Sequence, residues 1–193
     1  MTKIIVRSEK DAEAAFNRLK HVDVIGCDTE TSSLSSKTGR LYSIQISDGE
    51  LQVLVPISEG AKLFCLTELL SDECVMKVFH NARFDLGFLD AYSIRTRNIY
   101  CSMTAEKILT KGANQSSSLA ETVYRYFGLD LDKGQRKTFT EKWDGMWTEE
   151  LIEYALSDVV YLPRLMRAQM EWMNRLGLEH QYSEAINKIL SQE

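Results

Sequence analysis

Strand-like and helix-like hydrophobic patterns alternate along this 193-residue chain, and this alternation restricts the fold to the α/β class. Ser8 and Asp11 form the pattern of a capping box, which predicts a helix from that point. A largely buried strand is predicted over residues 22–28, and a helix with a leucine stripe over residues 61–70. There is no internal repeat and no linker rich in proline or glycine, so we expect a single domain over residues 1–193.

Residues 41–55 predict a β-hairpin. Apolar and polar residues alternate over 41–47, and a turn at 48–50 leads into a second apolar strand at 51–55. Three residues of the first strand are expected on one face of the sheet: Tyr42, Ile44 and Ile46.

Short strands and longer helices complete the pattern toward the C-terminus. Two further strands are predicted at residues 75–79 and 99–101. Four further helices are predicted at residues 84–92, 102–109, 118–127 and 148–176. Pro163 predicts a kink in the last of them, because proline cannot donate the backbone hydrogen bond of a helix interior.

Charge and hydropathy argue against several classes of protein. Lys and Arg number 23 against 28 Asp and Glu, a formal charge of −5, which disfavours a protein that coats nucleic acid but not an enzyme with a locally basic cleft. No apolar run approaches the ~20 residues of a membrane span or the core of a signal peptide, so we expect no membrane partner. The four cysteines contain no C-x-x-C pair and predict buried free thiols, which fits a cytoplasmic location.

Three separated segments place acidic residues where apolar elements end. Asp28 and Glu30 lie two residues apart at a predicted strand end, so both side chains leave the same face. Asp85 lies in the first turn of a predicted helix, and Tyr154 and Asp158 lie four residues apart on one helical face. Four hard oxygen donors suit Mg²⁺ or Mn²⁺, and two such ions about 3.5–4 Å apart promote in-line phosphoryl displacement.

Each of these residues also has a structural explanation by itself. Asp28 and Glu30 fit solvated acids at a strand end, and Asp85 fits the favourable end of a helix dipole. Tyr154 fits an ordinary amphipathic contact. Asp158, however, lies within a strongly apolar segment, where an unpaired carboxylate is costly and a metal ion removes the conflict.

The order and spacing of these segments resemble the motifs of the DEDD family of 3′–5′ exonucleases. Residues 24–30 with Leu34 are similar to its motif D-T-E-x-x-x-L, and residues 80–85 to H-N-x-x-F-D. Residues 154–158 are similar to the tyrosine form of the third motif, Y-x-x-x-D, and Glu153 stands where the histidine form requires His.

The resemblance extends to residues 118–133 and 147–155, which look like ribonuclease D and Werner-type exonucleases, and covers about residues 3–175. It implies an α/β, ribonuclease H-like three-layer fold, in which helices flank a mixed central sheet with the antiparallel hairpin at one edge. The chain departs from ribonuclease D at Cys101-Ser102, where relatives usually carry Asp-Thr. No HRDC or polymerase domain is expected beside the exonuclease domain.

The resemblance implies a role for each acid and for the tyrosine. Asp28, Glu30, Asp85 and Asp158 hold two divalent metal ions, Mg²⁺ or Mn²⁺, with Asp28 shared between them. Tyr154 orients the attacking water, since a phenol is a poor proton acceptor at neutral pH. The expected products are nucleoside 5′-monophosphates.

Seven further residues are predicted to contact the substrate: Thr29, Leu34, Asn81, Arg83, Phe84, Lys133 and Arg136. Leu34 resembles the family residue that wedges against the terminal bases, and Phe84 is placed to stack nearby, the alternative for both being ordinary core. Asn81 positions substrate or braces the acids. Arg83 and the basic segment 133–137 are placed to grip phosphates, the alternative for that segment being a solvated loop.

The resemblance therefore predicts a metal-dependent 3′–5′ exonuclease acting on the 3′ ends of single-stranded RNA or DNA, with ribonuclease D-like RNA trimming slightly favoured. One alternative is a DNA exonuclease, or a proofreading activity supplied in trans to a polymerase partner. Another is an inactive adaptor that binds nucleic acid, against which the presence of all four acids and the tyrosine argues. A phosphatase or nucleotide hydrolase is disfavoured because no P-loop or nucleophile motif occurs.

Overall fold

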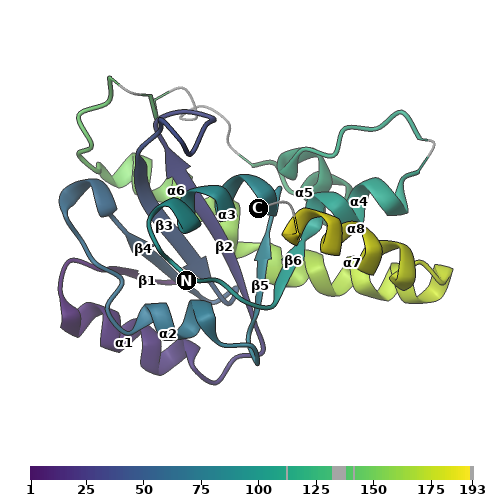
Figure 1. Ribbon diagram of the computed structural model, residues 1–193, viewed down its shortest axis with the longest axis horizontal. Coiled ribbons are helices and arrows are strands. Elements are labelled where there is room, and N and C mark those ends of the chain that lie inside the picture. The colour runs from purple at the N-terminus through teal and green to yellow at the C-terminus, as the bar shows by residue number, and fades with distance from the viewer. Residues whose placement is uncertain (112, 132–137, 141, 192–193) are drawn as a thin grey trace.

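A mixed six-stranded sheet forms the centre of the molecule. The computed structural model describes residues 1–111, 113–131, 138–140 and 142–191, and within them the strand order is β1-β4-β3-β2-β5-β6 (Figure 1). The strands are β1 (Thr2–Ile5), β2 (Val24–Thr31), β3 (Leu41–Ser47), β4 (Leu51–Val55), β5 (Met76–Phe79) and β6 (Ile99–Cys101). The β2–β3 and β3–β4 pairs are antiparallel and the others parallel, so the predicted mixed sheet is confirmed.

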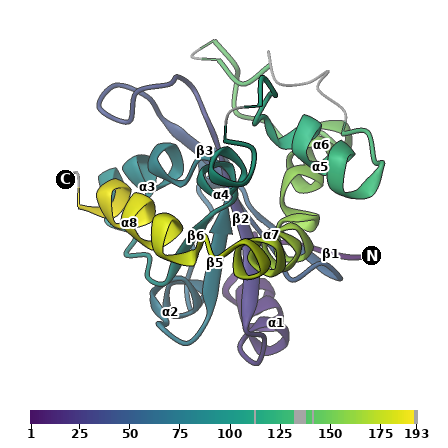
Figure 2. The ribbon, with the colours of Figure 1, turned by 90° about the vertical axis from the view of Figure 1, so that its right-hand side faces the viewer.

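Helices cover both faces of the sheet, which confirms the three-layer α/β prediction. They are α1 (Glu9–Leu19), α2 (Leu66–Ser71), α3 (Ala82–Ala91), α4 (Ser102–Leu109), α5 (Leu119–Phe127), α6 (Glu149–Val160), α7 (Leu162–Leu176) and α8 (Glu179–Leu190), with a 3₁₀ turn at Ile57–Glu59. The first three helices and α8 bury their apolar faces with one side of the sheet, and α6 and α7 pack on the other. Figure 2 shows α3 and α8 on one side of the strands and α6 on the opposite side. No helix in the described part of the chain is long and apolar enough to cross a membrane.

The predicted hairpin forms, but it is not an edge of the sheet. β1 pairs in parallel with β4 and takes the edge position, because the chain begins with a short apolar strand that the sequence analysis did not anticipate. The expectation that Tyr42 shares a face with Ile44 and Ile46 is also wrong. Glu30 pairs with Ser43 and the next residue with Leu41, so Tyr42 is an extra residue in the ladder and turns to the opposite face.

Most other elements lie where they were predicted, and their ends differ. The capping box at Ser8 and Asp11 is present at the start of α1. The predicted helix over 148–176 is two helices, separated at Tyr161, with Pro163 in the first turn of α7, where its missing N–H costs little. All four cysteines are free thiols, but only Cys27 and Cys101 are buried as predicted, whereas Cys65 is half-buried and Cys74 is exposed.

Gly26 sets the distance between β2 and the α6–α7 junction. A Cβ at this position would lie 2.4 Å from Val159 O and 2.9 Å from Leu162 Cβ, closer than packed atoms approach. Only glycine therefore permits the strand to run directly beneath the end of α6. This close approach brings the acidic residues of β2 under the last turn of that helix.

Candidate active site

The three acidic segments meet at one cavity of about 500 Å³. The residues of those segments that line it include all five expected there: Asp28, Glu30, Asp85, Tyr154 and Asp158. They come from β2, from the first turn of α3 and from α6, which are far apart in the sequence. The structure thus brings together every acid that the motifs singled out.

Strand alternation places Asp28 and Glu30 on the face of the sheet that α6 covers. On β2, Ile25 and Cys27 point into the core beneath α1–α3, and Gly26 faces the α6–α7 junction, so the even-numbered residues share the second face. The predicted strand ended at Asp28, whereas β2 continues to Thr31, so both acids lie within the strand.

Asp85 is the most deeply buried of the four acids. Its side chain is 1% exposed, and the Thr29 hydroxyl donates a hydrogen bond of 2.7 Å to its Oδ1. Burial raises the pKa of Asp85, and the bond from Thr29 opposes that rise because it stabilises the carboxylate. Thr29, predicted to contact substrate, therefore has a contact with an acid of the site.

The electrostatics of the cavity favour a cation. Burial raises the pKa of Asp28 well above its usual range, and the negative charges of Asp85, Glu30 and Asp158 raise it further. Four carboxylates around one cavity are the donor set that Mg²⁺ and Mn²⁺ prefer. In the described part of the chain no three acidic, histidine or cysteine side chains are already arranged to hold one ion. Because carboxylates repel one another, a bound cation would relieve the repulsion between these side chains.

Tyr154 lies between the cavity and an aromatic cluster. Its ring centroid is 6.1 Å from that of Phe139, with an interplanar angle of 31°. Phe139 also contacts Trp143 and Trp147, at 5.0 Å and 5.4 Å between ring centroids. The extra residue of β3, Tyr42, completes the cluster at 4.7 Å from Trp143. The rings leave Tyr154 only 8% exposed and restrict its orientation.

The predicted substrate contacts fall into three groups. Leu34 and Phe84 line the cavity; Leu34 is 86% exposed and so is not core, whereas Phe84 is half-buried and packs on Phe88. Asn81 lines it too, in a left-handed conformation with φ of 73° that begins α3. Arg83 is exposed and is not among the cavity-lining residues. Lys133 and Arg136 lie outside the described residues.

The sequence analysis missed several residues of the cavity wall. They are Thr31, Ser33, His80, Met103, Ser117, Ser118, Leu119, Ala120, Leu131 and Phe139. His80 was expected to be a structural hydrogen-bonding residue, because the mechanism implied by the resemblance has no task for it. Ser118, Leu119, Ala120 and Leu131 fall in the stretch that resembles ribonuclease D, but none of them was assigned a role. The segment from Ser117 to Ala120 forms part of the wall solely because tertiary contacts carry it there.

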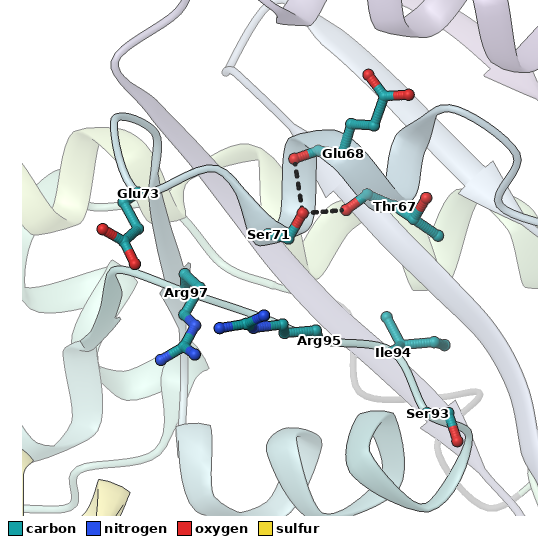
Figure 3. Close-up of a pocket in the computed structure, with 8 residues that line it drawn as sticks. All are labelled: Thr67, Glu68, Ser71, Glu73, Ser93, Ile94, Arg95 and Arg97. Carbon is teal, nitrogen blue, oxygen red and sulfur yellow. Dashed lines mark hydrogen bonds between the residues drawn. The ribbon is translucent and has the colours of Figure 1, made fainter.

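A second cavity, of about 450 Å³, lies away from the acids (Figure 3). Its lining residues are Thr67, Glu68, Ser71, Glu73, Ser93, Ile94, Arg95 and Arg97. The two glutamates balance the two arginines, so this cavity offers neither a cation nor an anion a preferred place. The chemistry of the motifs therefore belongs to the first cavity.

Comparison with known proteins agrees with this geometry. A family model described as 3′–5′ exonuclease matches residues 3–171. Ribonuclease D of Bartonella henselae is 30% identical over 176 residues, which cover 89% of this chain and 42% of the relative. Ribonuclease D of Zymomonas mobilis is 30% identical over 155 residues, which cover 79% of this chain and 39% of that relative. The chain thus spans less than half the length of these two relatives.

Solved structures show the same fold. Brucella melitensis NrnC aligns with a TM-score of 0.81 at 26% identity, over 98% of this chain and 90% of that one. NrnC has also been solved with bound Mg²⁺ and bound to pGG, each 25% identical to this chain. Escherichia coli RNase D aligns with a TM-score of 0.84 at 22% identity, over 98% of this chain and 50% of that one, and shows the fold alone.

Proposed function

Because the chain belongs to the 3′–5′ exonuclease family, we propose that it removes nucleoside 5′-monophosphates from the 3′ end of single-stranded RNA by metal-dependent hydrolysis. The observation that carries this proposal is the convergence of four carboxylates and Tyr154 on one cavity. The names of the curated relatives, Ribonuclease D, favour RNA over DNA.

The four acids are the proposed metal-binding residues. Asp28, Glu30 and Asp158 would hold one divalent ion, and Asp28 and Asp85 a second. Such ions, when bound, lower the pKa of a water molecule and neutralise charge on the scissile phosphate. The hydroxyl of Thr29 keeps Asp85 oriented and favours its ionised form.

Tyr154 would act on the attacking water, and Leu34, at the edge of the cavity, on the terminal nucleotide. The phenol of Tyr154 would orient the attacking water through a hydrogen bond, with its ring held by Phe139. Leu34, exposed at the rim, would press against the terminal base, and Phe84 and Asn81 would bound the terminal nucleotide. Arg83 would contact a phosphate outside the cavity.

A second candidate is the same reaction on very short oligonucleotides. The NrnC structure bound to pGG covers 97% of this chain and 87% of that one, a closer match in length than the ribonuclease D relatives give. A cavity of about 500 Å³ is of small-ligand size. Both features favour a substrate of few nucleotides.

End-labelled oligonucleotides test both candidates. Wild-type protein with Mg²⁺ or Mn²⁺ is expected to release mononucleotides from RNA, and EDTA to stop the release. Comparing an RNA 2-mer with a 20-mer decides between the candidates, and a DNA 20-mer tests the alternative of a DNA exonuclease. Asp28→Asn should abolish release, while Glu184→Gln, on the exposed side of α8, should not. Release that survives Asp28→Asn refutes the proposed site.

A further inference from the structure

A polar group centred on a buried carboxylate adjoins the carboxylate cavity. It consists of Glu106 and Ser102 on α4, Arg125 on α5, Gln169 on α7 and His80 after β5, and we name it the α4–α7 network. Glu106 is 1% exposed, and Ser102 and Gln169 are fully buried. His80 begins the motif that ends at Asp85 and lines the cavity, whereas the other four residues lie outside the acidic motifs.

Glu106 is the charged centre of the α4–α7 network. Its carboxylate accepts hydrogen bonds from Arg125 Nη2 at 3.0 Å and from Gln169 Nε2 at 2.9 Å. Gln169 Nε2 also donates to Ser102 O at 3.0 Å. A carboxylate in the core is tolerated only when paired in this way, because desolvation penalises it strongly.

The network ends on two successive carbonyls: that of Ser117, which lines the cavity, and that of Ser116, the residue before it. Arg125 Nη2 donates to Ser116 O at 2.8 Å, and His80 Nε2 lies 2.9 Å from Ser117 O. The other ring nitrogen of His80 lies 2.9 Å from Ser102 Oγ. Because a carbonyl can only accept, His80 donates through Nε2 to Ser117. The backbone beside the cavity is thus held from α5 and from the end of β5.

Stability alone does not explain the ion pair between the buried Glu106 and Arg125, whose side chain is 28% exposed. The same helices already pack through an apolar cluster that includes Ala105, Met166 and Leu119. Ion pairs contribute little net stability, whether they are exposed or buried. What the pair of Glu106 and Arg125 adds is a fixed direction for the guanidinium, which points at Ser116 O.

We propose that Arg125 and His80 are positioning residues for substrate binding: they fix the Ser116–Ser118 backbone so that this wall of the cavity holds the terminal nucleotide opposite the carboxylates. The inference rests on the proposed exonuclease function and deepens it. The acids come from β2, α3 and α6, outside the network. Loosening the wall should therefore weaken substrate binding and leave metal binding intact.

The test compares variants of Arg125 with a matched surface arginine. Arg125→Leu alone leaves Glu106 unpaired and endangers folding, so the main variant is Arg125→Leu with Glu106→Gln, which removes both charges together. Arg125→Lys keeps the positive charge, but an ammonium group is less suited than a guanidinium to bond Glu106 and Ser116 O at the same time. The control is Arg175→Leu, whose ion pair with Glu171 lies on the exposed face of α7. For each protein we would measure kcat and KM on an RNA oligonucleotide and Mn²⁺ affinity by calorimetry.

The expected result is a split between the two kinetic constants. The double variant should raise KM about tenfold, the loss predicted for one charge-assisted hydrogen bond, with kcat and Mn²⁺ affinity near wild type. Arg125→Lys should lie between, and Arg175→Leu should match wild type. An unchanged KM in the folded double variant overturns the proposal. So does loss of Mn²⁺ binding, because the network would then support the acids rather than the wall.

A binding measurement separates this inference from the proposed function. If wild-type protein released no mononucleotide, the proposed activity would fail. The fluorescence anisotropy of a fluorescein-labelled RNA 5-mer, titrated with protein in Ca²⁺, would still measure how tightly the cavity binds RNA. Weaker binding by the double variant than by Arg175→Leu supports the positioning role, and equal binding refutes it.

Discussion

Acidification should destabilise the protein through His80, which the fold holds in its neutral form. Burial lowers the pKa of His80 to about 4, against the opposing effect of its bond to Ser117 O. In the unfolded chain the pKa is about 6.5. As the pH falls, the unfolded state therefore binds a proton first, and stability that is present above pH 6.5 is lost. Linkage gives a loss of about 2 kcal/mol between pH 7 and pH 5, and about 3 kcal/mol well below pH 4.

Urea unfolding at pH 7 and pH 5 measures this loss, and His80→Gln is the reference protein. Glutamine does not titrate, and its amide N–H can replace the ring N–H as a donor to Ser117. The buried carboxylates of the cavity have raised pKa values, so their effect on stability has the opposite sign. It is common to both proteins and cancels in the comparison. Wild type should lose about 2 kcal/mol more than His80→Gln between the two pH values. Equal losses would show that His80 is not held neutral by burial.

Three substitutions test the cavity itself. Thr29→Val removes the 2.7 Å hydrogen bond to Asp85 and should weaken Mn²⁺ binding about tenfold, as measured by calorimetry. Thr29→Ser, which keeps the hydroxyl, should not. Equal affinities of the two variants would show that Thr29 does not support metal binding. Leu34→Ala should raise KM on RNA yet change the free energy of unfolding by less than about 0.5 kcal/mol, because Leu34 is 86% exposed; a larger loss would mean that Leu34 packs in the core. Gly26→Ala should destabilise the fold in urea by about 1–3 kcal/mol, since its Cβ would meet Val159 O at 2.4 Å, and a neutral result would refute the close approach of β2 to α6.

The acidic site was predictable because each of its parts is local in sequence. Asp28 and Glu30 lie on one strand, Asp85 begins a helix, and Tyr154 and Asp158 are one helical turn apart. The periods of strand and helix fix which way such neighbours point before any tertiary contact forms. That the three segments meet in space depends on the fold. It was predicted only because the order and spacing of the motifs resemble those of a known family.

The features that the sequence did not reveal depend on contacts between distant segments. The turn of Tyr42 into the aromatic cluster follows from a register shift against Thr31, and registers are decided by strand pairing rather than by alternation within one strand. Edge strand β1 is four residues long, too short for a periodic signal. Arg125 and Glu106 are 19 residues apart and Gln169 is 63 residues from Glu106, with no shared pattern.

The cavity therefore has two parts, the acids and the Ser116–Ser118 wall, and different substitutions should affect each of them. The acids are fixed by β2, α3 and α6, whose places follow from sheet order and from the contact at Gly26. The Ser116–Ser118 backbone accepts hydrogen bonds from Arg125 on α5, which pairs with Glu106 on α4, and from His80 after β5. In the proposed reaction the first set acts on the phosphate, whereas the second is proposed to hold the terminal nucleotide. A change in the α4–α7 network should therefore alter how tightly an oligonucleotide is bound without altering how its terminal phosphate is attacked.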